Sequence, residues 1–196
     1  MHFAFLNSLK HQYLQVIANF FILNFSDWKL ERTIGVDLNL QFPAKWEQAK
    51  EIKFSQGFVS PAPRDFVGNY PLEAPEAISI YDLAISNDFS LMLTYHTQGE
   101  VIYWQFLDFN PPNAQTYGDL FEKVSGYPLQ TTPYSSGFAG FKDWFIQNFN
   151  RPGYTVEAGI GKNPLPISQF DKIYMDNIGI LAYAALPIDK INQLTT

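Results

Sequence analysis

The sequence predicts an α/β protein with a mixed, mostly parallel sheet flanked by helices. Short β-prone runs alternate along the chain with longer segments of helical apolar spacing, which is the order that such folds show. The 196 residues, 46% of them hydrophobic, are enough for one domain with its own core. Thirteen Pro and 12 Gly indicate many defined loops and argue against a helical bundle.

The expected strands are short. A mostly apolar run at 89–95 fits a strand that is buried on both faces. Three further β-prone runs lie at 33–36, 101–104 and 154–158, and the first of them should lead directly into a turn.

Four segments are expected to be helical. Pro75 and Glu76 suit the first turn of one helix, because Pro needs no donor there and an acid is favourable near the positive end of the dipole. Asn113 and Gly126 can cap a second helix over 114–125, and a shorter third one should span 140–148. The last helix, over 167–186, should bury Phe170, Ile173, Tyr174, Ile178, Leu181 and Ala185.

Two regions fall outside this pattern. Residues 43–72 are punctuated by Pro and Gly and are expected to form a long irregular loop, which is often a functional feature. Residues 1–23 form an atypical amino-terminal segment, whose run 16–23 is shorter than a membrane span. A secretory leader is one interpretation of this run, but a buried strand or helix and a cytoplasmic location are favoured, because no small-x-small cleavage pattern follows.

Charge and composition narrow the possible partners. The formal net charge of −6 and the lack of a basic patch argue against nucleic acid and against an anionic membrane surface. The chain has no Cys, so disulfides, thiolate nucleophiles and Cys-based zinc sites are excluded. Any metal site must draw on three histidines, His2, His11 and His96, together with carboxylates.

Polar residues that could carry chemistry follow or end β-prone runs. They are Asp37 with Asn39, His96, and Glu157. An imidazole and two acids at strand ends suit a metal-dependent hydrolase, because one group can bind zinc, one can orient a ligand and one can accept a proton from water. The alternatives are a loop histidine with ordinary hydrogen bonds, a paired structural acid, and a turn organised by Asp37 and Asn39.

Several short motifs occur in the order that the zinc carboxypeptidase (carboxypeptidase A-like) family shows. They are Gly35-Val36-Asp37-Leu38-Asn39, the run 96–104 that starts at His96, Gly140-Phe141-Lys142-Asp143-Trp144-Phe145, the run 151–157 that ends at Glu157, and Asn163-Pro164-Leu165-Pro166. The chain resembles this family over about residues 24–188, and in particular its bacterial γ-D-glutamyl-L-diamino acid endopeptidases, which cut peptidoglycan stem peptides. The resemblance implies a truncated zinc-carboxypeptidase-like fold, with residues 24–196 as the remainder of a catalytic domain.

The resemblance also implies roles for particular residues. His96 matches the later zinc ligand, Glu157 the general acid/base, and Asp37 the acid that holds the first zinc histidine. Lys29 matches the cation that stabilises the oxyanion. Asn39, Tyr103 and Trp104 are expected on the substrate side of the site.

The sequence departs from the family at important positions. No His-x-x-Glu zinc motif occurs in it, so two of three protein ligands are not found unless His2 or His11 supplies one. Leu40 stands where carboxypeptidases place an arginine that grips the substrate carboxylate, and Ile146 stands at the expected place of a capping tyrosine.

The implied function is therefore hydrolysis of γ-D-glutamyl-diamino acid bonds by a zinc metallopeptidase, with an incomplete catalyst. The alternatives are a non-catalytic homologue that binds muropeptides, and a structural protein whose motifs are accidental. Loss of a central strand and helix should also expose a sheet edge, so self-association through that edge is expected unless residues 1–23 cover it.

Overall fold

The computed structural model describes residues 35–195 and contains a four-stranded mixed sheet. The strands are β1 (Met92–His96), β2 (Val101–Tyr103), β3 (Leu129–Gln130) and β4 (Gly153–Glu157), in the order β1-β4-β2-β3. β1 pairs with β4 and β2 with β3 in parallel, while β2 and β4 are antiparallel. The mixed, mostly parallel sheet expected from the sequence is confirmed.

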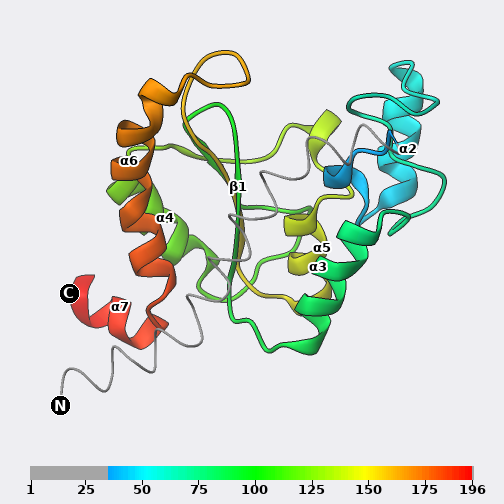
Figure 1. Cartoon of the computed structure of the whole chain (residues 1–196). Coiled ribbons are helices and arrows are strands. Elements are labelled where there is room, and N and C mark those ends of the chain that lie inside the picture. The colour runs from blue at the N-terminus through cyan, green and yellow to red at the C-terminus, as the bar shows by residue number, and fades with distance from the viewer. Residues whose placement is uncertain (1–34, 196) are drawn as a thin grey trace.

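One face of the sheet is covered by α4 (Ala114–Ser125), α6 (Phe170–Ala184) and α7 (Ile188–Thr195), as Figure 1 shows. Side chains from alternate strand positions meet these helices, because successive residues of a strand point to opposite faces. We call this the α4–α6 core, made of Ile102, Tyr117, Leu120, Phe121, Tyr127, Tyr154, Val156, Ala158, Ile180 and Ile191.

The other face carries α5 (Phe141–Phe149), with α3 (Pro75–Ser86) and α2 (Trp46–Ser55) beyond it (Figure 1). Two short 3-10 helices, η1 (Leu38–Leu40) and η2 (Tyr134–Ser136), lie in the connections on this side. Aromatic rings fill much of this second core, with Trp144 within 6.0 Å of the ring centroids of Phe42, Tyr81, Phe141 and Phe149.

The helices expected to start near Pro75, to span 114–125 and to span 140–148 are present with nearly those bounds. The loop expected over 43–72 contains α2, so that expectation was wrong for ten residues. The buried stripe of α2 is Trp46, Ala49 and Lys53, and its third member is a lysine. Because a charged residue occupies one of the buried positions, the sequence of α2 does not show the apolar spacing that predicts a helix.

The strand expected at 33–36 is also not confirmed. Gly35 and Val36 have no regular structure, and residues 33 and 34 lie outside the described residues. The domain boundary expected at residue 23 lies there as well.

The last helix has a different buried face from the one expected. Its inward residues include Asn177 and Ile180, whereas Phe170 is 55% and Tyr174 52% exposed. Asn177 turns inward because its amide donates to the Tyr127 hydroxyl (3.3 Å) and to the Ile173 carbonyl (2.8 Å). A separate helix, α7, follows after Pro187. Among the described helices, none combines the length and apolar character that a membrane span needs.

Candidate active site

His96 and Glu157 are the last register pair of the parallel ladder between β1 and β4. The Ala158 amide donates to the His96 carbonyl (2.8 Å) and closes the ladder at this end. Paired residues of neighbouring strands project from the same face of a sheet. The imidazole and the carboxyl group therefore leave the backbone side by side, at the carboxyl ends of two parallel strands.

Burial changes the protonation of both groups. It lowers the pKa of His96 below 6.5 and raises the pKa of Glu157 from 4.5 to about 7. A carboxyl group with a pKa near neutrality can both accept and return a proton, which is the property of a general acid/base.

The same face carries further polar groups next to this pair. Thr94 and Thr155 lie two residues before His96 and Glu157 on the two strands, and their hydroxyl oxygens are 3.0 Å apart. Tyr103 pairs with Thr155 across β2 and β4. Burial, and then the charge of Glu157, raises the pKa of Tyr103, which places its phenol within electrostatic reach of the acid.

Asp37 caps η1 and is held by two backbone amides. Its Oδ1 accepts from the Asn39 N–H (3.0 Å) and its Oδ2 from the Asp65 N–H (2.8 Å). Burial raises the pKa of Asp37, and these two hydrogen bonds act against that rise. The Asn39 side chain is exposed beside it. The contacts that Asp37 and Asn39 make in the structure are therefore those of the turn interpretation.

The loop that supports Asp37 is anchored to α2 by a buried ion pair. Lys53 Nζ lies 2.6 Å from Asp65 Oδ1, and the side chains are only 9% and 11% exposed. Arg64 bonds the second oxygen of Asp65. The buried lysine of α2 thus has a defined partner, Asp65, whose backbone amide in turn bonds Asp37.

Other expected site residues lie elsewhere. Trp104 packs against the α4–α6 core, so the structure does not bring its ring to the His96–Glu157 pair. Lys29, His2 and His11 lie outside the described residues.

Two of the departures from the family fall at buried positions. Leu40 is 7% exposed and belongs to the core around α5, while Ile146 is fully buried in α5 beneath Gly153. Both side chains therefore contribute to the core and neither is presented on the surface of the described residues. Tyr134 of η2, 68% exposed and hydrogen-bonded through its hydroxyl to Gln48 Nε2 (2.6 Å), is the exposed tyrosine of this region that sequence reasoning missed.

A zinc ion needs more donors than the described residues bring together. Catalytic zinc sites in proteins use three protein ligands and a water. Of the expected site residues that the structure describes, His96 is the candidate donor, and within residues 35–195 no group of three or more His, Asp or Glu side chains could hold a metal ion. The described residues therefore do not complete a zinc site by themselves.

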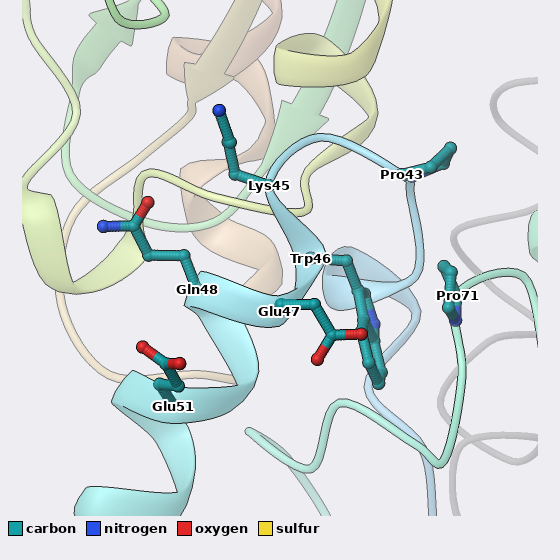
Figure 2. A pocket seen from close by; sticks show the side chains of 7 residues that line it. All are labelled: Pro43, Lys45, Trp46, Glu47, Gln48, Glu51 and Pro71. Carbon is teal, nitrogen blue, oxygen red and sulfur yellow. The ribbon is translucent and has the colours of Figure 1, made fainter.

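A separate open pocket of about 500 Å³ lies beside the first turns of α2. Figure 2 shows the Trp46 ring standing between Glu47 and Pro71. The pocket is lined by Pro43, Lys45, Trp46, Glu47, Gln48, Glu51 and Pro71, and none of the expected site residues is among them.

Comparison with known proteins places these observations in a family. Residues 18–179 match the family described as zinc carboxypeptidase. The chain is 51% identical over 158 residues to γ-D-glutamyl-L-diamino acid endopeptidase 1 of Lysinibacillus sphaericus, covering 80% of this chain and 38% of that protein. It is 43% identical to the uncharacterised protein YqgT of Bacillus subtilis, covering 81% of this chain and 41% of that one.

Solved structures share the fold. Bovine thrombin-activatable fibrinolysis inhibitor, in complex with tick carboxypeptidase inhibitor, superposes with a TM-score of 0.57 at 16% identity, covering 81% of this chain and 57% of that one. The carboxypeptidase A of Helicoverpa armigera gives 0.51 at 20% identity, with 81% and 41% covered. The chain thus spans about two fifths of the length of the curated relatives it matches. With the family match extending over most of its length, this chain belongs to the zinc carboxypeptidase family.

Proposed function

We propose that this chain carries the acid–base part of a peptidase site for γ-D-glutamyl-diamino acid bonds. The observation that carries the proposal is the His96–Glu157 register pair, with its partly buried carboxyl group of pKa about 7. The choice of bond follows the name of the 51% identical relative, a γ-D-glutamyl-L-diamino acid endopeptidase.

In this proposal Glu157 moves the proton through the reaction. Its carboxylate takes a proton from the attacking water while the water oxygen bonds to the substrate carbonyl carbon. The carboxyl group then gives this proton to the leaving nitrogen as the C–N bond breaks. Tyr103 is proposed to contact the peptide beside this acid, which its position on the same face of the sheet supports.

His96 is proposed as one metal ligand. Since the described residues supply no group of three ligands, the remaining donors would have to come from outside residues 35–195. Zinc content of the purified full-length chain tests this part. We expect stoichiometric zinc that is lost in His96→Ala and retained in the control Asp171→Asn, which removes an exposed acid of α6. Zinc that is absent, or that persists in His96→Ala, would contradict it.

A second candidate is a non-catalytic protein that binds muropeptides, and the incomplete ligand set of residues 35–195 favours it. The two functions separate when a γ-D-glutamyl-diaminopimelate peptide is incubated with the full chain and zinc. Release of diaminopimelate that stops in Glu157→Gln supports the peptidase. Saturable binding without release, unchanged by a chelator, supports the binding protein.

The partner proposal concerns β1, one of the two edge strands of the described sheet. Met92 N–H and His96 C=O bond toward β4, so by alternation the Leu93 amide points away from it. β1 contains no Lys, Pro or Gly, the residues that usually protect an edge. We infer that two copies associate through β1.

Sedimentation should show a dimer at higher concentration. Hydrogen exchange of the Leu93 amide should be slower in that dimer. A monomer at all concentrations would contradict the inference.

A further inference from the structure

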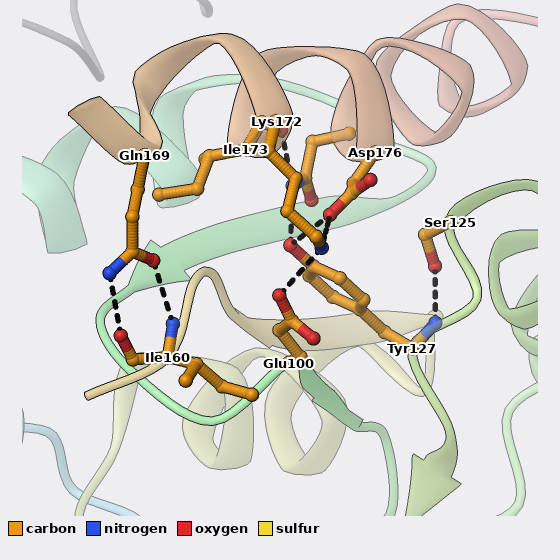
Figure 3. A network of polar contacts seen from close by, with 9 residues as sticks. Glu100, Ser125, Tyr127, Ile160, Gln169, Lys172, Ile173 and Asp176 are labelled. Atoms are coloured by element: carbon orange, nitrogen blue, oxygen red, sulfur yellow. Dashed lines mark hydrogen bonds and ion pairs between the residues drawn. The ribbon is translucent and has the colours of Figure 1, made fainter. Parts of the chain in front are cut away.

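The two segments that leave the site pair are both held by residues at the start of α6. These are Gln169, which ends the 3-10 helix η3 (Ile167–Gln169) and caps α6, and Lys172 in the first turn of α6. The chain leaves His96 through residues 97–100 and leaves Glu157 through residues 158–166, and together we call these segments the rim. In Figure 3 the Gln169 amide faces the backbone of Ile160. Its Nε2 donates to the Ile160 carbonyl (2.7 Å) and its Oε1 accepts from the Ile160 N–H (3.1 Å).

Lys172, one turn further along α6, holds the other segment. Its Nζ lies 2.7 Å from Glu100 Oε1 and 2.6 Å from Asp176 Oδ2 (Figure 3). Asp176 in turn accepts from the hydroxyl of Tyr127 (3.1 Å), a residue that is 2% exposed in the α4–α6 core. Glu100 is thereby tied to the buried framework through Lys172, immediately before β2 begins.

The two rim segments also bond directly to each other. The Gly99 N–H donates to the Gly159 carbonyl (2.8 Å), and Asn163 Nδ2 donates to the Thr97 carbonyl (3.0 Å). Gly159 is packed closely under α6, because a Cβ at this position would lie 2.6 Å from Leu165 Cδ1 and 2.7 Å from Ile173 Cδ1. Most of the side chains from Thr97 to Gly99 and from Ile160 to Asn163 are exposed, so apolar burial contributes little to holding these residues.

We propose that Gln169 and Lys172 are positioning residues that hold the rim in the arrangement a peptide meets when it approaches His96 and Glu157. The proposal rests on the proposed function for the identity of the ligand. A rim that is ordered before binding avoids the entropic cost of ordering it on binding, so substrate affinity depends on these two side chains although neither belongs to the site pair.

The test compares full-length variants by amide hydrogen exchange and by peptide affinity. The loss variant is Gln169→Ala/Lys172→Met, and Lys172→Arg is the conservative rescue because it keeps the charge. Lys190→Met is the control, since Lys190 contacts Gln193 on α7 (3.4 Å). The probe is a γ-D-glutamyl-diaminopimelate peptide. The reporting amides are those of Gly99 and Ile160, whose acceptors are both known.

In the loss variant we expect the Gly99 and Ile160 amides to exchange about three- to tenfold faster, as suits polar contacts at an exposed surface. Peptide affinity should fall by a similar factor, while the midpoint of denaturant unfolding stays the same. Lys172→Arg and Lys190→Met should resemble the natural chain.

Unchanged exchange at Gly99 and Ile160 in the loss variant would overturn the proposal, and so would faster exchange with unchanged affinity. A natural chain that binds no peptide would remove the proposed function instead. The exchange rates would then decide by themselves whether Gln169 and Lys172 hold the rim.

Discussion

His96 and Glu157 occupy one rung of the parallel ladder, and the backbone brings them together although 60 residues separate them in the chain. Both side chains belong to the α5 face of the sheet. Burial acts on them in opposite senses, lowering the pKa of the imidazole and raising that of the carboxyl group. Both effects favour the neutral form, and each has a consequence for stability.

Replacing Glu157 with Gln should make the protein more stable at alkaline pH. The pKa of Glu157 rises from 4.5 to about 7 on folding, so the natural chain loses stability as pH rises through this interval. Gln carries no charge and avoids the loss. We expect a gain of about 1–2 kcal/mol at pH 8, reduced from the full linkage value by partial exposure, and none at pH 4. Urea unfolding at the two pH values measures it; an equal effect at both would refute the assignment.

Replacing His96 with Gln should act on the acid side. The pKa of folded His96 lies below 6.5, so its unfolded form takes up a proton first, and stability falls as pH drops below about 6.5. The Gln variant should lose this decline. Unfolding free energies between pH 5 and pH 7.5 measure the slope. If the unfolding free energy of His96→Gln depends on pH in the same way as that of the natural chain, the lowered pKa of His96 does not contribute to acid instability.

Replacing Lys53 with Met should destabilise the protein by about 2 kcal/mol or more, because the buried carboxylate of Asp65 loses its main partner. Arg64 remains as a second partner, although its side chain is 80% exposed. The control is Lys162→Met at an exposed position, which should have little effect. Thermal or urea unfolding compares the two variants. Equal stability would show that the Lys53–Asp65 pair contributes nothing to the support of Asp37.

Replacing Gly159 with Ala tests the packing of the rim under α6. Gly57→Ala is a matched control, since both glycines have positive φ (74° and 96°) but no atom lies within 4 Å of a Cβ built at Gly57. The backbone strain is then common to both variants, and only Gly159→Ala adds a steric clash. We expect it to be the less stable by about 1–3 kcal/mol. Equal losses would mean that Leu165 and Ile173 move aside without cost.

The sequence predicted the elements whose signals are local. The helix expected at 114–125 has those bounds, and Gly126 ends it with an N–H bond to the Glu122 carbonyl, whereas Asn113 precedes it without the expected side-chain cap hydrogen bond. His96 and Glu157 follow from strand ends together with the family resemblance, and their adjacency then comes from the register of β1 and β4. The assignment of His96 as a metal ligand and Glu157 as a catalyst stays a prediction.

Other features depended on contacts between distant segments. α2 escaped prediction because its buried stripe includes Lys53, whose partner Asp65 lies in a loop 12 residues away. The inward face of α6 is set by Asn177, which bonds Tyr127 from another part of the chain. That Leu40 and Ile146, the two departures from the family, are buried in the core around α5 also became visible only in the structure.

The amino-acid sequence by itself determined the fold class, most of the strands and helices, and the acidic composition, because propensity, caps and apolar period act within a few residues; its ordered motifs determined the family. Only the tertiary structure decided which side chains share a face of the sheet, which charges are buried in pairs, and that α6 holds both segments leaving the site. Those outcomes depend on hydrogen bonds and packing between residues far apart in the chain, and a local sequence pattern does not specify which distant residues will be in contact.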